Sequence, residues 1–227
     1  MRAGAHHVHG GDVQMTPDLF DAQPVPGRNL LPRDGYVEYF GRIFTPAEAD
    51  QISAHLLQDI EWHHDQAVIY GKIITTKRKV AWYAEQPYSY TYSGTTKTAL
   101  GWTELLLKIK QRVEAVSQTS FNSCLLNLYH SGEEGMAWHS DAEQELKPQG
   151  EIASLSFGAV RNFQFKHKSM KELVGIRLEH GSLLVMKGTT QTHWLHCLPK
   201  AVRIKTPRIN LTFRQINTRV RSPAAKV

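Results

Sequence analysis

The stretch IASLSFGAVRNFQFKHKSMKELVGIRLEHGSLLVMKG, residues 152–188, contains four short apolar runs separated by turn residues. Runs of this length, rich in Val, Ile and Phe and bounded by Gly, Asn and Ser, are typical of antiparallel β-strands. The pattern continues on both sides, in CLLNLYH (124–130) and in RINLTFR (208–214), and no helical segment alternates with these runs. The chain after residue 120 therefore predicts a stacked antiparallel sandwich or jelly roll.

The first half of the chain predicts two amphipathic helices that pack outside this β core. In TPAE, residues 45–48, Thr45 can cap a helix with Pro46 in its first position and Glu48 three residues after the cap. A second helix is expected to begin near Thr103. The fold class is thus mostly β, of the α+β kind. The apolar stripes of the two helices are Ile52, Leu56, Leu57 and Ile60, and Leu106, Ile109, Val113 and Val116.

Length and composition favour one domain with two tails, in a chain of 227 residues. We expect a flexible leader over 1–24, a domain over 25–217 and a basic tail over 218–227. A net charge of +6 and a pI of about 9.3 favour a polyanionic partner such as nucleic acid. The two cysteines, Cys124 and Cys197, offer neither a disulfide framework nor a CxxC motif. We expect a monomer without a membrane segment in a reducing compartment, the cytoplasm or, in a eukaryote, the nucleus.

A cluster of possible metal ligands lies in NLYHSGEEGMAWHSD, residues 127–141. His139 and Asp141 are two residues apart, and in an extended backbone they point to the same side. A third ligand could come from THWLHC, as His193 or His196. Two histidines and a carboxylate are the facial set of Fe(II) oxygenases, whereas zinc would use such ligands in a hydrolytic site. The rival set in EWHHD, residues 61–65, is expected to end the first helix as surface residues.

The last predicted strand carries two arginines on its polar face. In RINLTFR, Arg208 and Arg214 alternate with apolar residues and would point inward, with a gap between them suited to a short dianion. Asn127 and Tyr129 share one face of CLLNLYH in the same way. A dicarboxylate held by arginine and polar donors beside iron would suit 2-oxoglutarate.

The motifs NLY, HSD, WLHCLP and RINLTFR, in this order and spacing, resemble the AlkB family of Fe(II)- and 2-oxoglutarate-dependent nucleic-acid dealkylases. The resemblance runs from about residue 60 to 216 and is closest to the members that repair duplex DNA. It selects His196 over His193 as the third ligand. It implies a double-stranded β-helix core over about 120–216 beneath a nucleotide-recognition lid over about 61–98.

The resemblance also implies roles for individual residues. Tyr92 would stack on the flipped base opposite His139, in a position where relatives often have Phe, and residues 67–79 would form a hairpin that fills the gap in the duplex. The iron ligands would be His139, Asp141 and His196; the 2-oxoglutarate contacts Asn127, Tyr129, Arg208 and Arg214; the base pocket Tyr90, Tyr92 and Glu143; and the DNA contacts Ile69, Tyr70, Gly71, Lys72, Arg78 and Lys79.

The reaction implied is oxidative demethylation of bases such as 1-methyladenine and 3-methylcytosine in DNA, with base flipping, 2-oxoglutarate and O₂ as cosubstrates, and release of formaldehyde. The alternatives are an AlkB-like demethylase of RNA or single strands, a zinc hydrolase with the same ligands, and a nucleic-acid-binding module without catalysis. Turnover without 2-oxoglutarate would indicate the hydrolase, and absence of succinate would indicate the binding module.

Overall fold

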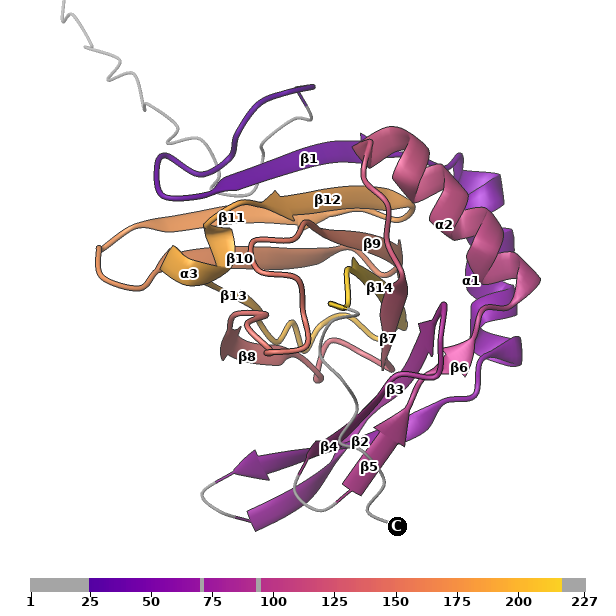
Figure 1. Cartoon of the computed structure of the whole chain (residues 1–227). Helices are drawn as coiled ribbons and strands as arrows, with labels where there is room; N and C mark the ends of the chain where they lie inside the picture. The colour runs from indigo at the N-terminus through magenta and orange to yellow at the C-terminus, as the bar shows by residue number, and fades with distance from the viewer. Residues whose placement is uncertain (1–24, 70–71, 93–94, 218–227) are drawn as a thin grey trace, which may run out of the picture.

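The computed structural model describes residues 25–69, 72–92 and 95–217, and for 67–69, 90–92 and 95–97 it describes the backbone alone. Two antiparallel sheets face each other in the core (Figure 1). The larger has the order β1 (Tyr36–Arg42), β12 (Ser182–Lys187), β9 (Ile152–Gly158), β14 (Arg208–Arg214), β7 (Ser123–Tyr129), β3 (Lys72–Ala84), β2 (His63–Ile69). The smaller has the order β11 (Leu173–Leu178), β10 (Arg161–His167), β13 (Trp194–Leu198), β8 (Met136–His139). The predicted jelly roll is confirmed.

Helices α1 (Pro46–Asp59) and α2 (Glu104–Ser117) cover the outer face of the larger sheet (Figure 1). α1 begins with the predicted capping box, in which Thr45 and Glu48 bond each other's backbone N–H groups. Thr103 caps α2 in turn, by accepting from the Leu106 N–H at 3.2 Å. Leu57 departs from the predicted apolar stripe, because it is 40% exposed while Leu56 is fully buried.

Alternation along β14 separates two environments. Its odd-numbered residues pack into the apolar cluster between the sheet and the helices, together with Leu126 and Leu155. Its even-numbered residues face the space between the sheets, as predicted from RINLTFR. The inward residues are Arg208, Asn210 and Thr212, all buried, and the outward residues are Ile209, Leu211 and Phe213. The central strand of the sheet therefore carries a polar interior face.

The segment predicted as a lid, residues 61–98, forms two hairpins that project from the core (Figure 1). β2 pairs with β3, and β4 (Ser89–Tyr92) pairs with β5 (Thr95–Thr98), while β6 (Leu100–Gly101) runs parallel to β3. The expectation that EWHHD ends the first helix is wrong: α1 stops at Asp59, and His63 opens β2. Tyr70 and Gly71 lie outside the described residues.

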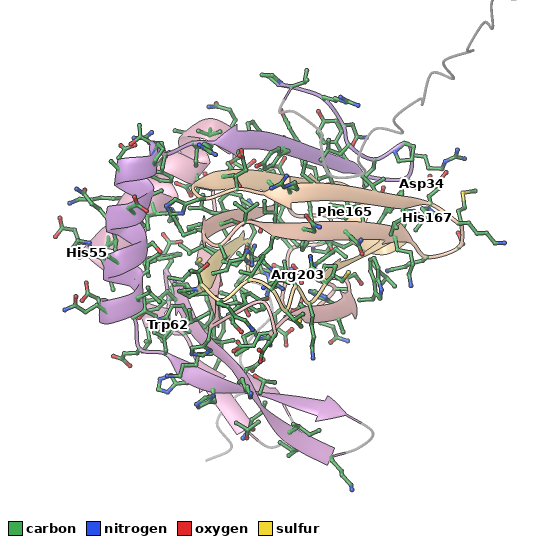
Figure 2. The ribbon with its side chains drawn as sticks, turned by 180° about the vertical axis from the view of Figure 1, so that it is seen from behind. Asp34, His55, Trp62, Phe165, His167 and Arg203 are labelled. Atoms are coloured by element: carbon green, nitrogen blue, oxygen red, sulfur yellow. The ribbon has the colours of Figure 1, made fainter. Side chains whose placement is uncertain are left out.

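The segment before β1 is bound to the smaller sheet where β10 ends and the chain turns into β11. The Nδ1 atom of His167 accepts the Met170 N–H at 3.1 Å, so its Nε2–H can donate to Asp34 at 3.2 Å. Asp34 has a positive φ of 52°, and neighbouring Arg33 pairs with Glu172 at 3.1 Å. Figure 2 shows Asp34 and His167 together at this edge. Among the described residues, no helix is long and apolar enough to cross a membrane.

Candidate active site

Three metal-ligating side chains meet between the sheets. His139 ends β8 and is the register partner of His196 on β13, and their rings lie 4.3 Å apart. The ligand atoms of these two histidines and of Asp141 all lie within 4.8 Å of one another. His193 belongs instead to the short helix α3 (Thr190–His193), where its ring stacks on His167 at 6.2 Å. The geometry thus brings together the predicted ligand set with His196 as its third member.

Neighbouring groups prepare each ligand for a metal ion. Nδ1 of His139 lies 2.8 Å from the carbonyl of Ala137, and because a carbonyl only accepts, Nδ1 carries the proton and Nε2 keeps its lone pair. Arg214 donates to Oδ1 of Asp141 at 3.0 Å. His196 packs against the rings of Phe163 and Phe165, which exclude water from it.

The protonation states also suit a metal site. Burial lowers the pKa of His196 to about 4, so its imidazole is neutral at neutral pH. Burial alone would raise the pKa of Asp141, but the charge of Arg214 holds that pKa below its usual value. Two imidazoles and one carboxylate form the facial set that suits Fe(II) and leaves positions open for a cosubstrate.

Arg208 is a buried cation without a built-in counter-charge. It is 3% exposed, and its Nη2 donates to Ser156 at 2.9 Å and to Asn210 at 3.0 Å. Its guanidinium lies over the ring of Tyr129, 5.5 Å from the centroid. Among the described residues no carboxylate pairs with it, and its Nε has no hydrogen-bond partner. Burial lowers the pKa of Arg208 to about 10, which still leaves it charged at neutral pH.

These unsatisfied groups fit a short dicarboxylate. Besides Arg208, the buried side-chain oxygen of Asn127 and the Nε of Arg214 have no partner in the described part of the chain. A half-turn of the Asn127 amide would present a donor to a carboxylate. Arg208 and Arg214 stand at the two ends of one polar face, with the metal ligands beside Arg214. The donors suit 2-oxoglutarate, with one carboxylate at Arg208 and its other end near the metal.

The residues predicted for the base pocket and the DNA surface are only partly described. Glu143 is half-exposed and lies 3.6 Å from Nη1 of Arg214. Tyr90 and Tyr92 belong to β4, but their side chains lie outside the described part, as does that of Ile69. The side chain of Lys72 is exposed, and that of Lys79 is partly buried.

Arg78 is placed differently from the prediction of a phosphate contact. Its side chain is 12% exposed, is paired with Asp65 and donates to the sulfur of Met136 at 3.0 Å. The guanidinium thus links the lid hairpin to β8, instead of standing free at the surface. Trp138 is 36% exposed, and the Lys166 ammonium lies 4.7 Å from its ring centroid.

Sequence reasoning missed Gln191, whose side-chain oxygen accepts the backbone N–H of Asp141 at 2.9 Å. The two residues are 50 positions apart, and no local motif links them. It also missed Ser156 and Asn210, which bind the guanidinium of Arg208. For these two there was a signal, because both are polar residues at alternate positions of strands that are otherwise apolar.

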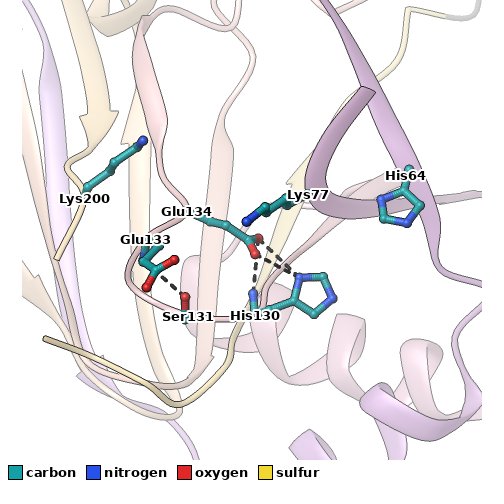
Figure 3. A pocket seen from close by; sticks show the side chains of 7 residues that line it. All are labelled: His64, Lys77, His130, Ser131, Glu133, Glu134 and Lys200. Atoms are coloured by element: carbon teal, nitrogen blue, oxygen red, sulfur yellow. Dashed lines mark hydrogen bonds and ion pairs between the residues drawn. The ribbon is translucent and has the colours of Figure 1, made fainter. Parts of the chain in front are cut away.

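Two cavities flank these elements. One, of about 580 Å³, is bordered by Arg214, by Gln191 and by one candidate metal ligand, Asp141. The other, of about 590 Å³, lies between the lid hairpin and the loop after β7 (Figure 3). It contains His64 and the hydrogen bond of His130 with Glu134 at 3.0 Å, but within the described residues the only group that could hold a metal is the one at His139.

The 2OG-Fe(II) oxygenase superfamily matches residues 36–214. The chain is 40% identical to the Mus musculus protein named DNA oxidative demethylase ALKBH2 over 185 residues, which cover 77% of each chain. It is 39% identical to the Bos taurus alpha-ketoglutarate-dependent dioxygenase alkB homolog 3 over 178 residues, 74% of this chain and 62% of that protein. The solved structure of OsALKBH1 matches with a TM-score of 0.54 at 16% identity, covering 82% of this chain and 98% of that chain, and this likeness concerns the fold.

The family match extends from β1 to β14, so it includes both sheets and every residue of the metal cluster. Zinc hydrolysis and binding without catalysis do not account for a buried, unpaired Arg208 beside an open facial set of ligands. Shared sequence and the chemistry of the site lead to one assignment: the protein is an enzyme of the AlkB family, a dioxygenase that uses Fe(II), 2-oxoglutarate and O₂.

Proposed function

We propose that this enzyme removes N-linked methyl groups from DNA bases of the 1-methyladenine and 3-methylcytosine type. The observation that carries the proposal is the attachment of the lid hairpin β2–β3 to strand β8, which ends at the candidate metal ligand His139, through Arg78 and Met136. A substrate gripped by the hairpin would therefore reach His139. The name of the mouse relative, DNA oxidative demethylase, and the net charge of +6 support DNA as that substrate.

Each group of residues in the site has a separate role in the proposed reaction. His139, Asp141 and His196 would hold Fe(II), and Arg208 would neutralise the distal carboxylate of 2-oxoglutarate. Fe(II), when bound, would supply the oxidative chemistry: one atom of O₂ enters succinate as 2-oxoglutarate loses CO₂, and the other hydroxylates the methyl group, which then leaves as formaldehyde. Phe163 and Phe165 keep water from the inner side of His196.

The base pocket is proposed to be formed by Tyr90, Tyr92 and Glu143. An aromatic ring can stack on any flipped base, and the half-exposed Glu143 carboxylate can accept from an exocyclic amino group. A methyl group at the pairing edge blocks the base pair and adds positive charge. The damaged base is thus easier to extrude than a normal one, which favours the lesion.

A duplex is the proposed form of the DNA. Ile69, Tyr70 and Gly71 would form the hairpin tip that fills the gap left by the flipped base. Lys72 and Lys79 would contact phosphates; Arg78 is reassigned to holding the hairpin, because Asp65 already pairs with it. We also infer that the enzyme acts as a monomer, in the cytoplasm or a eukaryotic nucleus; sedimentation of the purified chain with and without DNA tests the monomer.

The test compares one lesion in two settings. An oligonucleotide with 1-methyladenine is supplied single-stranded or in duplex, and succinate and the demethylated base are measured by mass spectrometry. Tyr70→Ala should lower duplex repair at least tenfold more than single-strand repair, whereas Thr75→Ala, an exposed change on the same hairpin, should alter neither. Equal losses for Tyr70→Ala would refute the wedge. Absence of demethylation on every methylated DNA strand would refute the proposed function.

A further inference from the structure

Asp141 is a metal ligand on irregular backbone. β8 ends at His139, and residues 140–143 belong to no helix or strand. His139 is held in register against His196, but the strand ladder does not reach Asp141. A ligand on a loop needs another restraint if its carboxylate is to meet the two imidazoles, because displacements of a fraction of an ångström weaken such sites.

That restraint comes from α3. The side-chain oxygen of Gln191 accepts the backbone N–H of Asp141 at 2.9 Å. Its amide nitrogen points to the sulfur of Met186 at 3.3 Å, and its own carbonyl accepts from the Lys168 ammonium at 2.8 Å. The preceding residue, Thr190, is 1% exposed and accepts the Tyr36 N–H at 2.9 Å, which fixes the helix to β1.

We propose that Gln191 is a positioning residue of the iron site. It touches neither metal nor substrate; it holds the main chain of Asp141 so that the carboxylate faces the imidazole rings of His139 and His196. Without it, the ion pair with Arg214 at 3.0 Å would remain, and this pair draws the carboxylate toward the guanidinium. This inference concerns the metal site and is independent of the nucleic-acid substrate.

The hydrogen bond from the Asp141 N–H to Gln191 determines which substitutions test the proposal. Only an acceptor oxygen at the right distance is needed, so Gln191→Glu keeps the bond, and the Lys168 ammonium beside the helix offsets the added charge. Gln191→Ala removes the acceptor, and Gln191→Asn is one methylene too short to reach Asp141. Thr192→Ala is the matched control, since Thr192 is exposed on the same helix and borders the same cavity.

The experiment is anaerobic titration of the metal-free full chain with Mn(II), a hard ion that accepts the same ligands, followed by calorimetry. We expect the Mn(II) dissociation constant to rise about 10- to 100-fold in Gln191→Ala and Gln191→Asn. The dissociation constants of Gln191→Glu and Thr192→Ala should stay within about threefold of that of the unchanged protein, well below the effect expected from the loss of an outer ligand partner. The metal-free melting temperatures should be alike in all four variants.

Two results would overturn the inference: Mn(II) binding in Gln191→Asn as tight as in the unchanged protein, or binding in Gln191→Glu as weak as in Gln191→Ala. The first would show that Asp141 needs no restraint from α3, and the second that the acceptor bond is not what matters. If Gln191→Ala fails to fold, the comparison of Gln191→Asn with Gln191→Glu still decides, since both retain a polar side chain of similar size.

Discussion

The two ends of β14 present guanidinium groups to the same interior face, but the two groups have different neighbours. Arg214 pairs with Asp141 at 3.0 Å and lies near Glu143, and these carboxylates raise its pKa despite burial. Arg208 has hydroxyl and amide oxygens as partners and an aromatic ring beneath it, and burial lowers its pKa. One cation is balanced within the chain, and the other is left to be balanced by a ligand.

The difference separates two tasks along a single strand. A buried ion pair is costly to break, because either partner alone becomes an uncompensated charge. Arg214 and Asp141 therefore support both the fold and the metal ligand. A buried cation without a partner costs stability until an anion arrives, so Arg208 lowers the stability of the free protein and strengthens the binding of a dicarboxylate.

The largest effect should follow from loss of a metal ligand outside this ion pair. His139→Ala should reduce 2-oxoglutarate-dependent succinate formation by more than about a thousandfold, since it removes one of three protein ligands. Its unfolding free energy should change little, because His139 is 36% exposed at the side chain. Near-normal succinate formation in this variant would mean that the metal site is elsewhere.

Asp141→Ala is the companion that sharpens the comparison. It should abolish activity equally, but it should also cost about 3–5 kcal/mol of unfolding free energy, because it removes the main counter-charge of the buried Arg214. Urea unfolding of the metal-free variants measures this. If His139→Ala and Asp141→Ala were equally stable, Arg214 would not depend on Asp141, and the contrast between the two arginines would be lost.

The two arginines should next differ when each is replaced by Met. Arg208→Met should leave the metal-free protein as stable as before, or more stable by about 1–4 kcal/mol, since an unpaired buried charge gives way to an apolar chain. Arg214→Met should destabilise it by about 3–5 kcal/mol, since Asp141 then stands alone. Urea unfolding of the free protein reads out both changes.

The cosubstrate supplies the second half of this test. Adding 2-oxoglutarate to the Mn(II)-bound protein should further raise the melting temperature of the unchanged protein but not that of Arg208→Met, whose KM for 2-oxoglutarate should rise about 10- to 100-fold with the loss of a charge-assisted bond. Arg42→Met, at an ion pair whose arginine is 50% exposed, is the control and should change neither. A normal KM in Arg208→Met would show that the dicarboxylate binds elsewhere.

The smallest effect is expected at Glu143. Its carboxylate is half-exposed and lies 3.6 Å from Arg214, so solvent screens the interaction. Glu143→Gln should change the unfolding free energy by less than about 1 kcal/mol and leave the KM for 2-oxoglutarate unchanged. Its effect should appear as altered preference between methylated adenine and cytosine. A loss of stability as large as in Asp141→Ala would mean that Glu143 is a main partner of Arg214.

Local patterns predicted the parts of the site that lie on regular elements. The alternation of RINLTFR gave the interior face of β14 because period-2 geometry is a property of the strand itself. The choice between His193 and His196 was not local: α3 ends at His193 and β13 begins at Trp194, a boundary set by tertiary pairing with β10. The family resemblance made that choice, and the structure brings His196, not His193, beside His139 and Asp141.

Contacts between side chains that are brought together only by the fold could not be predicted from the sequence. Lys and Arg in a hairpin look alike in a pattern, so the pairing of Arg78 with Asp65 could not be told from a free basic residue. Leu57 was predicted to belong to the apolar stripe of α1, because a stripe one residue wider still fits a helical period. The positions of α2 and the sheet leave the Leu57 side chain exposed. Gln191 reaches Asp141 only after α3 and β8 have docked.

The central place of β14 in the larger sheet constrains how the chain can fold during synthesis. β14 pairs with β9 on one side and β7 on the other, although it is the last strand of the described chain. Until it emerges from the ribosome, β7 and β9 both expose an unpaired edge, and nascent chains in this state are prone to associate. The same strand carries Arg208 and Arg214, so a chain that has not closed its sheet cannot yet bind its cosubstrate.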